Sequence, residues 1–193
     1  MDFKKWFLSK VRHPNYNDWK EIESYFKTAL DSSFALTETC NKSKECKEYL
    51  REGEYELALD NLIELPIEAR IPQPHKYWKN LLRAANKMNL IEVEQEINRL
   101  LNQPTKFEIE SIFNVTRRGK CIAAKQITFV SNWELSENSY LGGLKIHNWT
   151  EIPRAIDKTG NQRYDLFIFK PDDEKELANI SEGDILELKS NQL

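Results

Sequence analysis

Apolar residues recur with a helical period through the first hundred positions of the chain. After the capping signal Asn17-Asp18, one apolar stripe follows the first predicted helix. Its members are Trp19, Ile22, Phe26, Ala29 and Leu30. A second predicted helix ends at Gly53, and a third begins at Tyr55 and stops at Pro66, because proline disfavours a helix interior. These two helices are therefore expected to meet at a tight glycine turn.

Two further helices are predicted before the pattern changes. Pro74 is well placed to open the fourth helix, because its fixed φ angle suits the first helical position. Asn89 suits the left-handed conformation that ends such a helix. The apolar positions of the two helices are Trp78, Leu81, Leu82, Ala85 and Met88, then Leu90, Val93, Ile97, Leu100 and Leu101. The helical pattern ends at Gln103-Pro104, which predicts a helical domain over residues 1–104.

From Phe107 onward the apolar period shortens towards two, which is typical of strands. Segments 107–115 and 121–130 predict two strands joined by a turn at 117–120, so a hairpin is the simplest interpretation. Segments 164–169 and 184–188 predict later strands, with turns at Gly142-Gly143 and at 159–161. Such a series predicts a small antiparallel β-barrel or sandwich over residues 105–193. The expected fold class is α+β, with a helical bundle before a β-rich, barrel-like domain.

The charge of the chain is small and evenly distributed. The formal net charge is −3, with 16 basic and 17 acidic residues through Thr105 and 12 and 14 after it. Neither half has the positive excess that nucleic-acid binding usually needs, so a nucleic-acid partner is not expected. No apolar run approaches the roughly 20 residues that span a bilayer, and the N-terminus lacks a secretory signal. We therefore expect a cytoplasmic protein with no membrane partner.

Residues that could carry chemistry are scattered. His13, His75 and His147 stand singly, and no nucleophile elbow, phosphate-binding loop or paired metal-ligand motif is present. The cysteines, Cys40, Cys46 and Cys121, fit neither a disulfide framework nor a zinc ligand set and are expected to be free thiols. We expect no catalytic residues, no cofactor and no metal, and hence a binding protein. An enzyme whose site is assembled from distant residues stays an open alternative.

Two charged segments have competing interpretations. The basic turn Arg117-Arg118-Gly119-Lys120 either binds phosphate or an acidic surface, or is a soluble hairpin turn, which we favour because it is short. The N-terminal segment 3–12 mixes aromatic residues with lysines. It is either a membrane-surface helix or, as we expect, a segment that packs on the helical core.

In the segment Ser43–Glu64 a predicted helix ends at Gly53 and Glu-Tyr-Glu-Leu-Ala-Leu opens the next, and Tyr77–Leu90 ends in Lys-Met-Asn-Leu. These features, over roughly a quarter of the chain, resemble the MafI and CdiI type of immunity protein of bacterial polymorphic toxin (contact-dependent growth inhibition) systems. The resemblance implies a toxin inhibitor that neutralises a cognate toxin domain, often a nuclease, in a stoichiometric complex. Family members are usually much shorter, and this sequence has a long additional C-terminal region.

A nuclease toxin tends to be basic, and complementary charge speeds association, so acidic surface residues are candidate contacts with the toxin, and the arginines of the basic turn are candidates for an acidic part of its surface. The partner-binding candidates are Glu52, Glu54, Asp60, Glu64, Arg117 and Arg118.

The C-terminal region has a weaker resemblance of its own. Segments 107–120 and Ile180-Ser181-Glu182-Gly183-Asp184-Ile185-Leu186 look like the first hairpin and the closing strand of the β-barrel second domain of translational GTPases such as elongation factor Tu. The GTP-binding motifs are absent. An RNA- or ribosome-associated β-barrel adaptor protein is therefore the alternative to an immunity protein.

Overall fold

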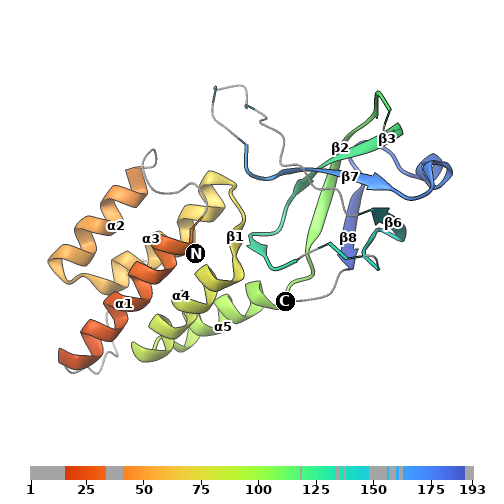
Figure 1. Cartoon of the computed structure of the whole chain (residues 1–193). Helices are drawn as coiled ribbons and strands as arrows, with labels where there is room; N and C mark the ends of the chain where they lie inside the picture. Colours follow the sequence, from red (N-terminus) through yellow and green to blue (C-terminus); the bar gives the residue numbers. More distant parts are fainter. Residues whose placement is uncertain are drawn as a thin grey trace. The chain divides into compact units, whose positions relative to one another are not determined.

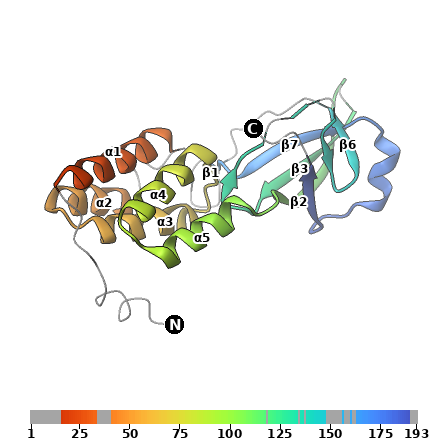
Figure 2. The same cartoon turned by 90° about the horizontal axis from the view of Figure 1, so that it is seen from below.

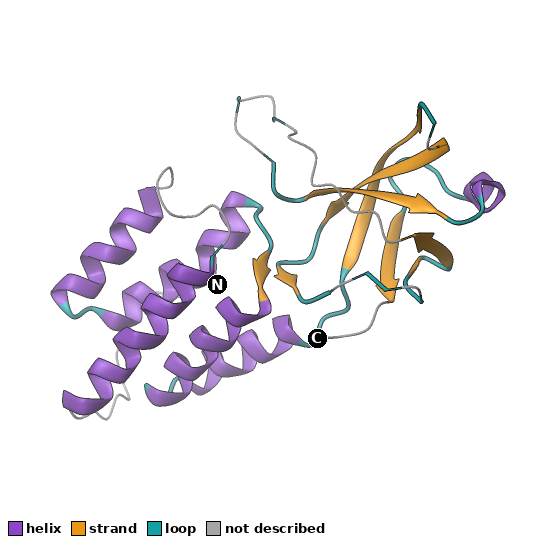
Figure 3. Ribbon diagram, viewed as in Figure 1, coloured by secondary structure: helices purple, strands orange, loops and turns teal. Residues whose placement is uncertain are grey.

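The chain forms two compact units, which Figure 1 colours by sequence and Figure 3 by secondary structure. The computed structural model describes residues 16–33, 41–117, 119–133, 135, 136, 138–147, 156, 160 and 163–189. The first unit contains residues 1–65 and 76–101, and the second contains 66–75 and 102–193. The N-terminal segment 3–12 and Cys40 lie outside the described residues, as do Thr159 and Asn161 of the predicted 159–161 turn. The α+β class, with helices before strands, is confirmed.

Five α-helices are found among the described residues, and Figure 2 shows them grouped together. They are α1 (Tyr16–Ser32), α2 (Asn41–Glu52), α3 (Tyr55–Ala69), α4 (His75–Lys87) and α5 (Ile91–Leu101). The predicted stripes supply core residues: Ile22, Phe26, Leu81 and Ile97 are fully buried. In the described part of the chain, no helix combines the length and apolarity needed to cross a membrane.

Two helix ends follow directly from the local sequence. Gly53 has a φ of 77°, its N–H donates to the carbonyl of Leu50, and the N–H of Glu54 donates to that of Tyr49. This double hydrogen bond ends α2 and needs a residue that tolerates positive φ. Asn89, with a φ of 58°, ends α4 in the same way. The predictions for the glycine turn and for Asn89 are confirmed.

The prediction that Pro66 ends the third helix is wrong, because α3 continues to Ala69. Proline lacks the N–H that would bond to the carbonyl of Leu62, four residues earlier. That carbonyl instead accepts a 2.6 Å hydrogen bond from the hydroxyl of Tyr77, which is fully buried on α4. A tertiary contact therefore supplies the hydrogen bond that the proline cannot make.

The second unit contains a six-stranded antiparallel sheet. Its strands are β2 (Lys106–Val115), β3 (Gly119–Gln126), β5 (Tyr140–Leu141), β6 (Leu144–His147), β7 (Leu166–Pro171) and β8 (Ile185–Lys189). The neighbours run β2-β3-β7-β6-β5-β8, and β8 pairs again with β2. The ladders that β5 and β6 make are short. A 3₁₀ helix, η3 (Glu174–Asn179), follows β7.

The hairpin predicted from the alternating pattern is confirmed as β2 and β3, although the second strand ends at Gln126 instead of Val130. The buried side-chain amide of Gln126 donates to the carbonyls of Thr128 and Val130 and so stabilises the bend that follows. Val130 lies in β4 (Val130–Ser131), which pairs in parallel with β1 (Gln73–Pro74). The fourth helix therefore starts at His75, one residue after Pro74. The predicted Gly142-Gly143 turn joins β5 to β6, and both glycines have positive φ.

One face of the sheet forms the core of the second unit. Aromatic rings of Phe107, Phe167 and Phe169 meet edge to face or stacked, with Trp133 beside them. Such contacts stabilise a core beyond the apolar area that they bury. Buried apolar residues from β2, β3, β5, β6, β7 and β8 thus make up this core.

Candidate partner-binding surface

Among its described side chains, helix α3 presents carboxylates at four-residue intervals, namely Glu56, Asp60 and Glu64. Residues four apart lie on the same face of a helix, so we call this set the acidic stripe. Glu64 is exposed, whereas Glu56 and Asp60 are partly buried. Carboxylates at this spacing repel one another, so the stripe destabilises the free helix and favours a positively charged partner.

Asp60 is the most perturbed member of the acidic stripe. Burial, followed by the charges of Glu64 and Glu56, raises the pKa of Asp60 from 3.8 to about 6. No cation among the described residues forms an ion pair with its carboxylate. A cationic group brought by another molecule would therefore meet an anion that the protein itself leaves uncompensated.

The other acidic candidates lie at the turn that leads into α3. Glu52 and Glu54 are exposed on either side of Gly53. Glu52 makes an ion pair with Arg51, with 3.1 Å between Oε1 and Nε, and both side chains are mostly solvent-exposed. Such an exposed ion pair contributes little to stability, so little free energy is lost when the Glu52 carboxylate leaves Arg51 to contact a partner. The structure thus brings Asp60 and Glu64 onto one helical face and leaves Glu52 and Glu54 at the preceding turn.

The basic candidates belong to the second unit. Arg117 is exposed in the β2–β3 turn and has a φ of 68°, and Arg118 lies outside the described residues. The neighbouring Lys120 N–H donates to Glu174 Oε1 at 3.0 Å. A Cβ on Gly119 would lie 2.0 Å from the same oxygen. A carboxylate of η3 therefore already occupies part of the turn, and a side chain at position 119 would displace it.

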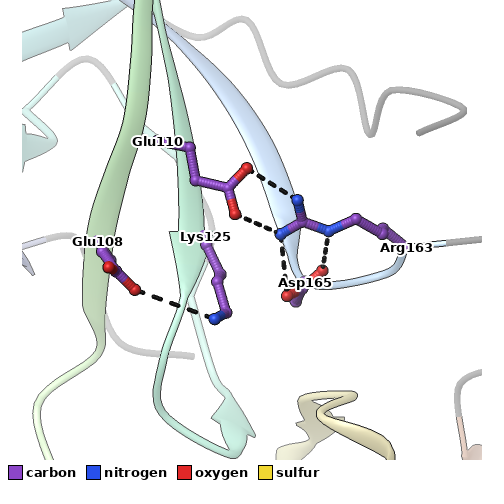
Figure 4. Close-up of polar contacts among 5 residues, drawn as sticks. All are labelled: Glu108, Glu110, Lys125, Arg163 and Asp165. Carbon is purple, nitrogen blue, oxygen red and sulfur yellow. Dashed lines mark hydrogen bonds and ion pairs between the residues drawn. The ribbon is translucent and has the colours of Figure 1, made fainter. Parts of the chain in front are cut away.

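A second charged cluster, which sequence analysis missed, lies on the sheet (Figure 4). Arg163 donates two hydrogen bonds to Glu110, at 2.8 and 2.7 Å, and two to Asp165, at 3.0 and 3.1 Å. These hydrogen bonds raise the pKa of Arg163. Lys125 lies beside the cluster, 3.9 Å from Glu108. The guanidinium is occupied on both sides, so this cluster connects strands and is not an open site.

The local cause of the Arg163 cluster is an irregularity in β2. The β2–β3 register shifts between Ile109 and Ser111, so that Glu110 has no partner on β3. An extra residue of this kind bends a strand and redirects a side chain. Glu110 and Arg163 are separated by 53 positions in the sequence. Neither the register shift nor this pairing leaves a signal in the hydrophobic pattern.

The cysteine thiols and possible metal ligands of the described residues form no reactive site. Cys46 and Cys121 are free and buried, and burial raises the pKa of the Cys46 thiol to about 12, which keeps it protonated and unreactive. No group of three or more His, Cys, Asp or Glu side chains within the described part of the chain is arranged to hold a metal ion.

In comparisons with known proteins, no family model matches this sequence, and no curated protein is significantly similar to it.

Proposed function

We propose that the chain is an immunity protein that acts in the bacterial cytoplasm by binding a cognate toxin, with no catalytic residue or cofactor of its own. The observation that carries the proposal is the acidic stripe of α3, with Asp60 partly buried and uncompensated by any described cation. The part of this helix from Tyr55 to Glu64 lies within the segment that resembles MafI and CdiI immunity proteins.

The expected partner is a toxin domain with a basic surface, such as a nuclease. A nuclease must bring positive groups to the phosphates of its substrate, and an inhibitor that covers those groups has to present carboxylates. Complementary charge accelerates the encounter and excludes partners of the wrong sign. The acidic residues at the Gly53 turn, Glu52 and Glu54, extend the negative surface beyond the helix.

The proposal is tested by co-expressing the chain with the product of the open reading frame that precedes its gene. We expect growth to be rescued from that product and a one-to-one complex to be recovered by gel filtration. Glu64→Lys should slow association by about tenfold at low salt. Glu182→Lys, an exposed control in the second unit, should leave the rate unchanged. Absence of rescue and of a complex would refute the proposal.

A further inference from the structure

Strand β2 of the second unit is fully paired on one side only. β3 pairs with it over residues 107–115. On the opposite side β8 pairs with residues 106–108, and Figure 1 shows β2 extending beyond β8. Ile109 still exchanges hydrogen bonds with the two residues that precede β8. Over residues 111–115, no described backbone group pairs with the side of β2 that faces away from β3, and we call this side the free edge.

The free edge lacks the features that usually protect the edge of a sheet. An unpaired strand readily adds another strand, so natural edges carry charged residues or proline, or are interrupted by bulges. Residues 111–115 read Ser-Ile-Phe-Asn-Val and contain neither a charge nor a proline. The register shift of β2 lies before this stretch, and the ladder with β3 is regular along it. The free edge is therefore a regular, uncharged strand to which a further strand can be added.

The side chains of this stretch would also gain apolar contacts from an added strand. Ile112 packs against the core of the second unit, so its neighbour Phe113 points to the opposite face of the sheet. Phe113 and Val115 lie on that face and are only partly buried. A strand paired with the free edge would cover part of both side chains.

The two ends of the free edge differ in charge. Glu110, immediately before it, belongs to the Arg163 cluster, which holds two carboxylates around one guanidinium. In the turn after it, the exposed Arg117 and Lys120 outnumber the carboxylate of Glu174. A second copy of this strand in antiparallel orientation would place its positive end beside the negative end of the first. A parallel copy would bring like charges together, which destabilises a pair of strands.

We propose that two copies of the chain pair through the free edge, in antiparallel orientation about a two-fold axis at Phe113. The residues that face each other are Phe113 with its own counterpart, Ser111 with Val115, and Ile112 with Asn114. Aromatic pairs on neighbouring strands stabilise a sheet, and the axis creates such a pair from Phe113 alone. Glu110 then faces Thr116, next to Arg117 of the second copy. One segment thus supplies both halves of a complementary interface.

Sedimentation velocity of the full chain, from about 1 μM to about 1 mM, measures this association. A ladder of about five residues from each copy is short, so we expect a weak dimer that appears as concentration rises. Phe113→Lys sets like charges directly opposite each other and should weaken the dimer about tenfold, with an unchanged far-UV circular dichroism spectrum. Ile91→Lys, the matched control at a 65% exposed position of α5, should leave it unchanged. A chain that stays monomeric at every concentration would refute the proposal.

The antiparallel orientation is tested by charge reversal. Arg117→Glu should weaken the dimer about threefold, because the new carboxylate faces the negative end of the second copy. Lys79→Glu, the same change at an exposed position of α4, should have no effect. A dimer that is insensitive to Arg117→Glu would overturn the antiparallel orientation.

Cysteine cross-linking locates the axis without relying on affinity. Residues that face each other on paired strands have Cβ atoms about 5 Å apart, so Phe113→Cys should cross-link to its own counterpart with a short bis-maleimide. Thr116→Cys is exposed three residues further along, about 20 Å from its counterpart in this arrangement, and should not. The wild type gives the background from the native cysteines. Equal cross-linking of the two variants would place the interface elsewhere and overturn the proposal.

Discussion

The hydroxyl of Tyr77 replaces the hydrogen bond that Pro66 removes from α3, and this substitution can be measured. In Tyr77→Phe, the carbonyl of Leu62 loses its 2.6 Å hydrogen bond while the ring remains in place. Tyr77 is fully buried, so water does not take over the bond. An unsatisfied buried carbonyl costs about 1–3 kcal/mol, which is the expected loss in the free energy of unfolding.

The decisive comparison repeats Tyr77→Phe in a Pro66→Ala background. Alanine restores an N–H that can donate to the carbonyl of Leu62 within the helix. The carbonyl then keeps a partner when the hydroxyl is removed, so the cost of Tyr77→Phe should fall by about 1 kcal/mol. Pro66→Ala alone is not expected to destabilise the protein, because the new hydrogen bond and the relief of the ring's clash with the Leu62 carbonyl offset about 0.4–1 kcal/mol of lost chain stiffness.

The wild type, the two single variants and the double variant are compared by urea unfolding, which is followed by far-UV circular dichroism. The comparison requires that the free energy of unfolding falls with urea concentration at the same slope in all four proteins. The coupling energy is the difference between the two costs of Tyr77→Phe. Equal costs in both backgrounds, within about 0.5 kcal/mol, would show that the hydroxyl does not replace the missing helical bond.

The other predictions concern charged residues. Asp60 has a folded-state pKa of about 6, above its ordinary 3.8, so folded protein binds this proton more tightly than unfolded protein, and stability falls as pH rises from 3.8 to about 6. Asp60→Asn should therefore stabilise the protein at pH values above the raised pKa, by on the order of 1 kcal/mol after solvent screening, and should not stabilise it at lower pH. A difference in thermal unfolding between the variant and the wild type that does not depend on pH would contradict this assignment. Arg163→Leu leaves Glu110 and Asp165 without their cation and should cost about 2 kcal/mol, whereas Lys125→Ala, whose pair is longer at 3.9 Å, should cost less than about 0.5 kcal/mol in the same melts. Gly119→Ala should lower the free energy of unfolding by at least about 1 kcal/mol, because residue 119 has a φ of 81° and the new methyl group would contact Glu174. Adding Glu174→Ala should remove the contact but not the backbone strain. Full recovery of stability in the double variant would refute the strain at φ.

The sequence predicts which residues form much of the candidate surface, but it does not predict how far each of them is buried or hydrogen-bonded. Helical spacing alone places Asp60 and Glu64 on one face, and the same spacing includes Glu56. The partial burial of Asp60 depends on what packs beside α3. The period of apolar residues predicts which face of a helix is buried. It does not predict which hydrogen bonds a polar side chain at the edge of that face makes.

By itself, the sequence determined the features that depend on neighbouring residues: the helical stripes, the left-handed helix ends at Gly53 and Asn89, and the hairpin of β2 and β3. Tertiary structure decided whatever required a partner from far along the chain. It allowed α3 to continue through Pro66, because Tyr77 supplies a hydrogen bond from another helix. It also paired Glu110 with Arg163 and assigned residues 66–75 to the second unit. Local preferences are worth only a few kcal/mol, so a single well-placed buried contact can overrule them.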